Sequence, residues 1–175
     1  MRRFGPADFR TMPWANGRGA TVELYREDGA DGLILRLSLA TVAEPGPFSA
    51  LPGLARVLVL IDGPGFTLDI AGRPHPLRPL TPIRFSGGAP AAAREVPGPS
   101  RDFNVMRAEA LPPAEVRVLT AGQGMTAARV FLFALAPTRI TAEGDTVALP
   151  AESLAEVAGP AELHAGGPCI GIALA

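Results

Sequence analysis

Residue types that carry much of enzyme and metal chemistry are scarce in this sequence of 175 residues, which contains no lysine, one cysteine and two histidines. Without lysine, neither Schiff-base chemistry nor a lysine-containing phosphate loop is available. Cys169 alone forms no internal disulfide and no cysteine-based zinc site. His75 and His164 lie far apart in the chain, so they lack the short spacing of paired metal ligands. We therefore expect neither a metal nor a cofactor.

An excess of charge of one sign and long apolar runs are also missing. The 16 basic residues, all arginine, face 17 acidic residues, which gives a formal net charge of -1 and argues against nucleic acid as a partner. The longest apolar runs, at residues 57–61 and 130–136, are far too short to cross a bilayer. Behind the basic residues near the N-terminus there is no apolar stretch of the kind that defines a signal peptide. These absences predict a cytoplasmic protein without membrane contacts.

Glycine and proline are abundant instead, with 20 and 19 residues, about twice their ordinary usage. They separate short apolar runs that are typical of β-strands. In residues 33–40 every second position from Leu35 is leucine, as in a strand with one buried face. Residues 56–61 and 66–71 flank an Asp-Gly-Pro-Gly turn and predict a hairpin. Further strands are predicted at residues 80–85, 103–107, 116–120, 129–136, 146–149 and 170–174.

The strand pattern continues through the whole chain, and helical signals are weak. Residues 89–96 and 152–157 are the two short helix candidates. Many short strands separated by turns predict an all-β sandwich or barrel. Each half of the chain has an apolar strand pair followed by a loop. We expect a domain at residues 1–110 that carries a ligand pocket and a smaller, mainly structural domain at residues 111–175.

Three segments contain polar residues that a bare β-scaffold does not need. In the first, residues 13–23, a lone tryptophan precedes a glycine-rich loop. Asn16 offers both a donor and an acceptor, and Gly17 and Gly19 allow close approach of the backbone. No lysine and no helix follow, so this is not a phosphate loop. The alternative is an N-terminal turn in which Trp14 fills the core.

The other two polar segments are predicted strands. Arg36 and Ser38 share the face opposite the leucines, where an arginine inside a barrel would bind a carboxylate through bidentate hydrogen bonds. The alternative is that this face is open to solvent. Asp102, Asn104 and Met106 also share one face, and a polar pocket wall would explain this combination.

At these segments the sequence resembles the HutD/Ves family of bacterial proteins, which is associated with histidine utilisation. The family motifs run approximately Trp-Lys-Asn-Gly-Gly-Gly-x-Thr-x-Glu, Arg-x-Ser-x-Ala, Gly-Pro-Phe-Ser-x-Phe-Pro-Gly and Asp-Phe-Asn-Val-Met. Their counterparts occur in the same order at residues 14–23, 36–40, 46–53 and 102–106. The resemblance implies an all-β cupin fold (an RmlC-like jelly roll, or double-stranded β-helix) in a bicupin arrangement. Ala15, Arg18 and Leu51 depart from the family's lysine, glycine and aromatic residue.

The resemblance implies a binding or regulatory protein whose pocket takes a small anionic metabolite of histidine breakdown, urocanate or N-formylglutamate. Arg36 or Arg56 would pair with its carboxylate. No residue is assigned a catalytic role and none is assigned to a metal. The predicted ligand-binding residues are Trp14, Asn16, Gly17, Gly19, Thr21, Glu23, Arg36, Ser38, Phe48, Arg56, Asp102, Asn104 and Met106.

Two other functions fit the same residues. One is a metal-independent enzyme in which Glu23 and Asp102 act as general acid and base on a small polar, acyl or sugar substrate. The other is a structural or interaction protein in which Trp14 and residues 46–53 fill the barrel. Exposed edge strands would allow a homodimer in any of these cases.

Overall fold

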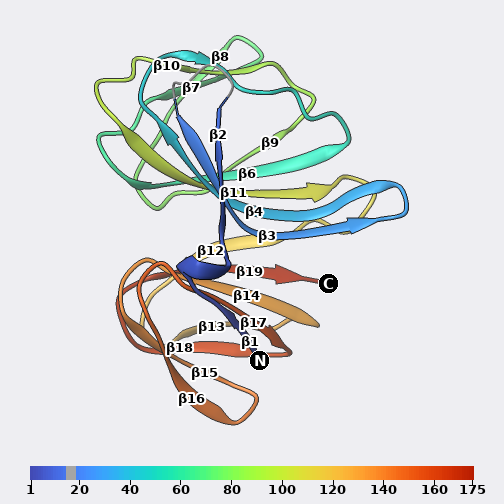
Figure 1. The fold of residues 1–175 in the computed structure, drawn as a ribbon, viewed down its shortest axis with the longest axis vertical. Coiled ribbons are helices and arrows are strands. Elements are labelled where there is room, and N and C mark those ends of the chain that lie inside the picture. Colours follow the sequence, from blue (N-terminus) through green and yellow to red (C-terminus); the bar gives the residue numbers. More distant parts are fainter. Residues whose placement is uncertain (15–18) are drawn as a thin grey trace. The chain divides into compact units, whose positions relative to one another are not determined.

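The computed structural model describes residues 1–14 and 19–175 of the chain, which form strands, turns and one short 3-10 helix, η1 (Pro6–Asp8). Two compact units are present (Figure 1): the first comprises Arg10–Leu111, and the second combines Met1–Phe9 with Pro112–Ala175. The all-β class predicted from the sequence is confirmed. Within the described part of the chain, no helix is long and apolar enough to span a membrane.

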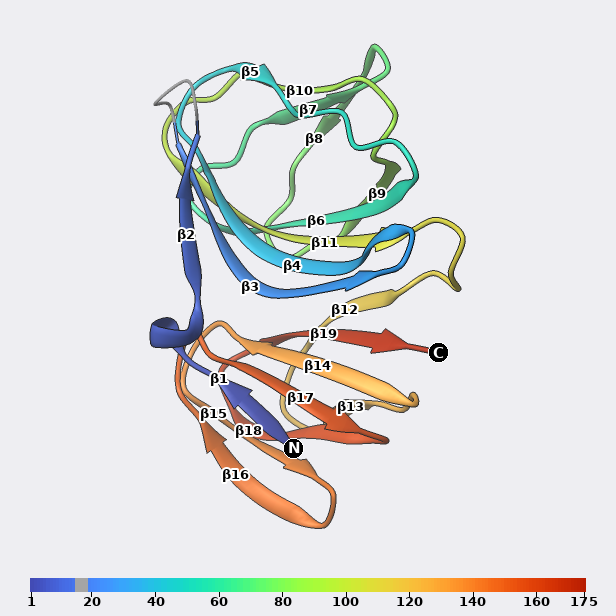
Figure 2. The same ribbon diagram turned by 45° about the vertical axis from the view of Figure 1, so that its right-hand side comes forward.

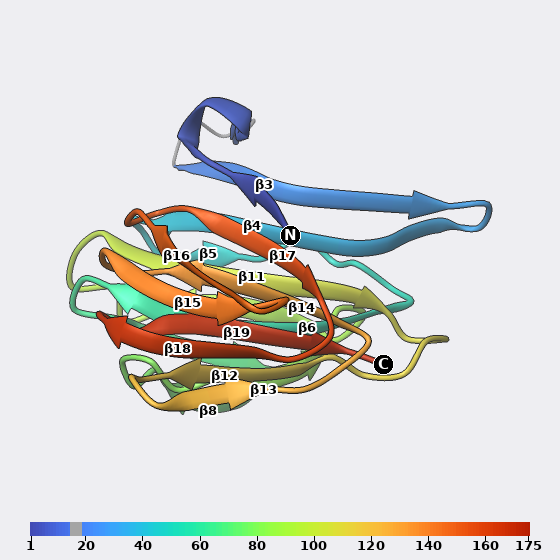
Figure 3. The ribbon, with the colours of Figure 1, turned by 90° about the horizontal axis from the view of Figure 1, so that it is seen from below.

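The first unit contains two sheets, and Figure 2 shows the smaller sheet lying over the larger one. The larger sheet has six strands in the order β2 (Arg10–Pro13), β3 (Ala20–Gly29), β4 (Gly32–Val42), β11 (Ser100–Ala108), β6 (Leu54–Asp62) and β9 (Ile83–Ser86). The smaller sheet has four strands in the order β5 (Gly46–Pro47), β10 (Ala91–Arg94), β7 (Thr67–Ile70) and β8 (Arg73–Pro76). Strands β3 and β4 form a long hairpin, seen along its length in Figure 3.

The second unit also contains two sheets. One has five strands in the order β1 (Arg2–Phe4), β17 (Leu154–Ala158), β14 (Arg129–Ala134), β19 (Cys169–Leu174) and β12 (Glu115–Leu119). The other has four strands in the order β13 (Gln123–Met125), β18 (Ala161–Gly166), β15 (Thr138–Ala142) and β16 (Asp145–Leu149). Strand β1 pairs with β17, so the first nine residues belong to this unit, whereas the predicted boundary at residue 110 placed them in the first domain.

The predicted hairpin between residues 56–61 and 66–71 is wrong. Strands β6 and β7 belong to different sheets, and the turn between them carries the chain from one sheet to the other. Gly63 and Gly65 both have positive φ angles, +85° and +81°, which glycine adopts without steric cost. The two helix candidates are also strands, because residues 89–96 contain β10 and residues 152–157 overlap β17.

Each unit has its own apolar core, to which both of its sheets contribute. In the first unit the core residues are Val42, Leu58, Phe66, Leu68 and Ala93, with Trp14 and Phe48 among the partly buried residues packed against them. In the second unit the core includes Leu119, Met125, Val130, Leu132, Ile140, Leu149, Val157, Leu163 and Cys169. Polar side chains from β4, β6 and β11 are also buried in the first unit: Ser38, Arg56, Asp102 and Asn104.

Leu58→Ala should destabilise the first unit strongly, because Leu58 is fully buried and its truncation leaves a cavity. Substitutions of this kind cost about 2–5 kcal/mol. Urea unfolding monitored by tryptophan fluorescence would measure the loss. Leu111→Ala is the matched control, since Leu111 is 36% exposed, and it should change stability by less than about 1 kcal/mol. Equal effects of the two substitutions would contradict the assignment of Leu58 to the core.

Candidate functional site

The register of β11 with β4 and β6 brings polar side chains from three strands together. Strand β11 lies between the other two and pairs antiparallel with both. Residues directly opposite each other in a sheet point to the same face. Each row of three paired residues, one from each strand, therefore contributes three side chains to one face. The rows, each given from β4 through β11 to β6, are Arg36, Met106 and Arg56; Ser38, Asn104 and Leu58; and Ala40, Asp102 and Leu60. The polar residues predicted on two separate strands therefore form one surface.

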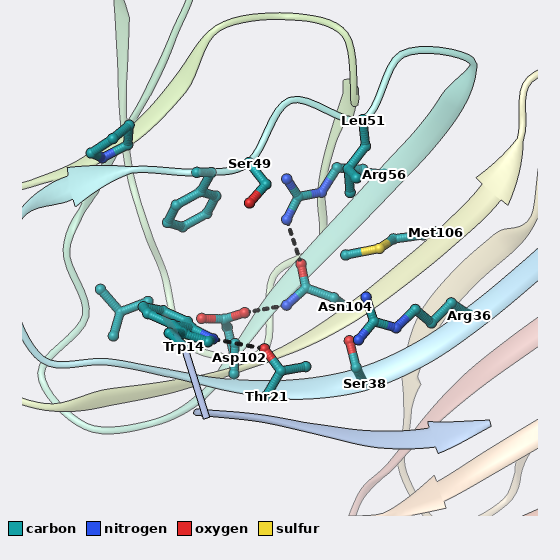
Figure 4. Close-up of a pocket in the computed structure, with 14 residues that line it drawn as sticks. Trp14, Thr21, Arg36, Ser38, Ser49, Leu51, Arg56, Asp102, Asn104 and Met106 are labelled. Carbon is teal, nitrogen blue, oxygen red and sulfur yellow. Dashed lines mark hydrogen bonds between the residues drawn. The ribbon is translucent and has the colours of Figure 1, made fainter. Parts of the chain in front are cut away.

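This surface borders a cavity of about 510 Å³ in the first unit (Figure 4). The segment 47–51, between β5 and β6, contributes further wall residues, and Trp14 contributes an aromatic ring. The volume is within the range of small-molecule sites in proteins. The lining residues are Trp14, Thr21, Arg36, Ser38, Ala40, Val42, Pro47, Phe48, Ser49, Leu51, Arg56, Asp102, Asn104 and Met106.

Arg56 is a buried cation without a carboxylate partner in the described part of the chain. Its side chain is 6% exposed, and its guanidinium carbon lies 5.4 Å from the centre of the Phe48 ring and 4.9 Å from that of Phe85. Nη2 donates a hydrogen bond to Asn104 Oδ1 at 3.1 Å. Nε has no hydrogen-bond partner among the described residues. Burial lowers the pKa of Arg56 and outweighs the charge of Asp102, which raises it, while the positive charge of Arg36 acts in the same direction as burial.

Asn104 connects Arg56 to a buried acid. Its amide oxygen accepts from Arg56, and its amide nitrogen donates to Asp102 Oδ1. Asp102 is 1% exposed, and its Oδ2 has no partner among the residues that the structure describes. Burial raises the pKa of Asp102 to about 7, although the Asn104 hydrogen bond and the charge of Arg56 both favour the ionised form. A carboxyl group that changes its charge near neutral pH thus lies in the cavity wall.

The second arginine of the wall is matched by an acid. Arg36 Nε lies 2.7 Å from Glu23 Oε2, and Arg26 Nη1 lies 3.9 Å from the same oxygen. Ser38, next to Arg36 on the inner face of β4, is 1% exposed, and its Oγ finds no partner among the described residues. Because Glu23 already balances Arg36, Arg56 is the arginine of the wall that has no direct ion pair among the described residues; the charge of Asp102 acts on it across Asn104.

Trp14 closes one side of the cavity through close contacts with β3 and β4. Its Nε1 donates a hydrogen bond to Thr21 Oγ1 at 2.9 Å, and its backbone N–H donates to the Gly19 carbonyl at 2.9 Å. A Cβ atom at Gly19 would lie 2.6 Å from the Thr41 carbonyl oxygen and 2.9 Å from ring carbons of Trp14. Gly19 is therefore required for close packing beside the tryptophan, and it does not itself line the cavity.

Most of the predicted ligand-binding residues with described positions come together at this cavity: Trp14, Thr21, Arg36, Ser38, Phe48, Arg56, Asp102, Asn104 and Met106. Glu23 and Gly19 support wall residues from outside the lining. Asn16 and Gly17 lie outside the described residues, as do Ala15 and Arg18. Of the predicted acid–base pair, Asp102 lines the cavity, whereas Glu23 is ion-paired with Arg36 and is not among the lining residues.

The prediction did not include Ala40, Val42, Pro47, Ser49 and Leu51. Two signals could have identified some of them. Ala40 continues the alternation of Arg36 and Ser38 along β4, and the residues between 47 and 51 belong to the Gly-Pro-Phe-Ser motif. Val42 is apolar and belongs to the core cluster as well, so the sequence carries no separate signal for its place in the wall.

The wall does not provide a set of metal ligands. Asp102 is its one carboxylate, and no histidine or cysteine is among the lining residues. Across the described residues there is no group of three His, Cys, Asp or Glu side chains that could hold a metal ion. The donor set of this cavity therefore does not fit the histidine-rich metal site of metal-binding cupins.

Paired sheets that enclose a side-chain-lined cavity define the first unit as a cupin-type barrel, and structural comparison assigns the chain to the cupin fold. A cupin 2 conserved barrel domain protein from Leptotrichia buccalis superposes with a TM-score of 0.57 and 10% identity over 89% of each chain, which is a likeness of fold alone. Two units with two sheets each are compatible with the bicupin arrangement implied by the sequence.

The family follows from closer comparisons. The family model described as HutD matches residues 6–169, and the chain belongs to the HutD family. HutD from Pseudomonas fluorescens SBW25 has 29% identity and a TM-score of 0.85, covering 99% of this chain and 98% of that one. A conserved protein of unknown function from Pseudomonas aeruginosa PAO1 has 30% identity and a TM-score of 0.88, covering 99% and 97% of the two chains.

A curated relative connects the family to a genetic locus. It is an uncharacterized 21.2 kDa protein in the 3′ region of hutC in Pseudomonas putida, 38% identical over 104 residues. The alignment covers 58% of this chain and 55% of the relative, so the chain spans just over half the length of that relative. The HutD family is thereby associated with the histidine utilisation locus.

Asp102→Asn should stabilise the free protein above neutral pH. A pKa raised from 3.8 to about 7 on folding means that the folded state binds the proton more tightly than the unfolded state. Stability therefore falls as the pH rises from about 4 to about 7, by on the order of 4 kcal/mol. Asparagine keeps the shape and removes this loss. We expect a higher unfolding midpoint for the variant than for the wild type at a pH of about 8, and similar midpoints at a pH of about 4. The same difference at both pH values would contradict the argument.

Gly19→Ala should displace Trp14 from the cavity wall, because the new Cβ atom would overlap the indole ring and the Thr41 carbonyl oxygen. Trp14 is the single tryptophan of the chain, so its fluorescence emission reports the displacement directly, as a shift to longer wavelength. Gly98→Ala is the matched control, since its Cβ atom would lie 3.6 Å from Pro64 Cγ, an ordinary contact. An unchanged emission spectrum in Gly19→Ala would refute the packing role of this glycine.

Proposed function

We propose that this protein is a HutD-like small-molecule-binding protein that modulates histidine utilisation by binding an anionic metabolite of that pathway in its cavity, without a metal ion. The two candidate ligands are urocanate and N-formylglutamate. Membership of the HutD family and the relative in the 3′ region of hutC support the connection to the pathway. The residues of the cavity wall support the anionic character of the ligand.

The single observation that carries the proposal is the environment of Arg56. A buried guanidinium without a direct ion pair is unfavourable, because burial removes its hydration and Asn104 separates it from Asp102, the carboxylate whose charge acts on it. Two aromatic rings and one amide oxygen hold the group in place, and its Nε still lacks a partner among the described residues. A carboxylate of the ligand would supply both a direct ion pair and the missing acceptor.

The remaining wall residues suit a small, partly unsaturated or flexible carboxylate. Phe48, Met106 and Trp14 provide apolar and aromatic surface, while Ser38 Oγ offers a further hydrogen-bonding group that is unused by the described residues. An open cavity with these groups favours binding over the structural alternative, in which Trp14 and residues 46–53 would fill the barrel.

Arg56→Met should weaken binding of the metabolite by at least about 30-fold, because losing one partner of a buried charge pair costs about 2–5 kcal/mol. Methionine retains an apolar side chain between Phe48 and Phe85, so the fold should survive. Isothermal titration calorimetry with urocanate and with N-formylglutamate measures the effect.

Arg73→Met serves as the matched control for this titration, because Arg73 is exposed on β8 and does not line the cavity. It should bind as the wild type does. If neither metabolite binds the folded wild-type protein, the proposed function is wrong. If either binds and Arg56→Met binds equally well, Arg56 is not the carboxylate site.

A further inference from the structure

We propose that Asp102 is a second contact of the ligand, and that the cavity selects a carboxylate that also carries a hydrogen-bond donor at its other end. The inference rests on the proposed function and deepens it, since it concerns the chemical class of ligand rather than the existence of binding. It assigns a specificity role to an acid that the carboxylate-binding function alone does not require.

Four buried groups of the wall have no hydrogen-bond partner among the described residues: Arg36 Nε, Ser38 Oγ, Arg56 Nε and Asp102 Oδ2. Arg36 Nε is ion-paired with Glu23 and the Ser38 hydroxyl can donate or accept, so the two charged groups that remain, Arg56 and Asp102, are of opposite kinds. Arg56 Nε is a donor, and Asp102 Oδ2 is an acceptor whenever the carboxyl group is ionised. Both residues are more than nine-tenths buried, so solvent does not readily compensate them. A ligand that is an acceptor at both ends would satisfy Arg56 and leave Asp102 facing another acceptor.

The Asn104 amide fixes which oxygen of Asp102 remains for the ligand. Its oxygen must face the guanidinium and its nitrogen must face the acid, because the opposite orientation would place two donors together at Arg56 and two acceptors together at Asp102. This arrangement uses Asp102 Oδ1. Figure 4 shows the other carboxylate oxygen directed away from the amide. Asp102 Oδ2 is thus the carboxylate oxygen of the wall that has no hydrogen bond among the described residues.

The donor group of the wall, Arg56, and its acceptor group, Asp102, lie at different positions along β11. Arg56 on β6 is paired with Met106 of β11, and Asp102 lies four residues before Met106 on β11. The backbone separation of Met106 and Asp102 is therefore about 14 Å. The Arg56 side chain reaches back toward Asn104 and shortens this distance. A ligand with its carboxylate at Arg56 and its donor at Asp102 would therefore lie along β11, over Asn104.

The charges around Asp102 favour the same orientation. Arg56 on β6 is the cation that acts on it, Arg36 on β4 is balanced by Glu23 on β3, and the lining segment 47–51 contributes no titratable group. A ligand carboxylate at Asp102 would require the acid to be protonated. A ligand N–H would instead favour the ionised acid and lower the pKa of Asp102 in the complex. The two orientations therefore predict opposite pH dependences of affinity.

The first experiment compares urocanate with furylacrylate, its furan analogue, which keeps the carboxylate and the five-membered ring but has no N–H. At a pH of about 8 the imidazole ring of urocanate is neutral and Asp102 is ionised. Titration calorimetry of the wild-type protein should show urocanate binding at least about tenfold more tightly, as expected for a hydrogen bond to a charged group.

Asp102→Asn should reduce or invert this preference. Asn104 would still donate to the amide oxygen at position 102, so the amide nitrogen would occupy the place of Asp102 Oδ2 and present a donor to the ligand. Asp62→Asn is the matched control, because Asp62 is exposed at the end of β6, and it should keep the wild-type preference. The unfolding midpoints of both variants verify that they are folded.

The second experiment measures the affinity for 4-formamidobutanoate, which keeps the side-chain carboxylate and the formamide N–H of N-formylglutamate but lacks its α-carboxylate, at pH values of about 6 and about 8, between which none of the ligand's own groups titrates. Donation of its amide N–H to Asp102 predicts up to about tenfold tighter binding at the higher pH. Asp102→Asn should abolish the slope.

The outcomes separate the two proposals. If no probe binds the wild-type protein, the proposed function and this inference both fail. If probes bind but furylacrylate equals urocanate, or Asp102→Asn leaves the preference unchanged, the inference fails and the proposed function stands. A flat or inverted pH slope for bound 4-formamidobutanoate also overturns the inference. A preference for urocanate and a rising slope, both lost in Asp102→Asn, support it.

Discussion

The Arg56 guanidinium, buried between two phenylalanine rings and joined to Asp102 through Asn104, is the interaction on which the cavity depends. The guanidinium and the acid are of opposite charge, yet an amide separates them and prevents a direct ion pair. Each charged group therefore keeps one unused hydrogen-bonding atom within the described structure. In a site built for stability alone, the two would be paired directly or replaced by apolar residues. A cost in stability of this kind is common at functional sites.

The sequence predicted much of this wall because the period-two alternation of a strand can be recognised locally. This alternation assigned Arg36 and Ser38 to the face of β4 opposite its leucines. In β11 it assigned Asp102, Asn104 and Met106 to the face opposite Phe103 and Val105. Alternation carries no information about which strands are neighbours. The pairing of β4 with β11 joins segments more than 50 residues apart in the chain, and only the fold places their polar faces side by side.

The wrong predictions also arise because the sequence does not show which strands are neighbours. The turn at residues 62–65 contains the residues of a tight hairpin, but it connects two sheets because β7 finds its partners in β8 and β10. Residues 152–157 offer a proline before a short polar segment, which is typical of a helix start, but pairing of β17 with β14 and β1 determines their structure. Likewise, the ion pair between Glu23 and Arg36 depends on the register of β3 with β4, so the sequence could not distinguish a supporting acid from one in the cavity.

Strand β11 has a consequence for how mutations can accumulate in this chain. Its two faces alternate without interruption, with Phe103 and Val105 fully buried on one side and Asp102 and Asn104 on the other. A shift of one residue in its pairing would exchange the two sets, burying an acid and an amide among leucines and valines. Any insertion or deletion within β11 would therefore remove both the core packing and the cavity wall together. A substitution in β11 can change one face at a time, whereas a change in its length alters both.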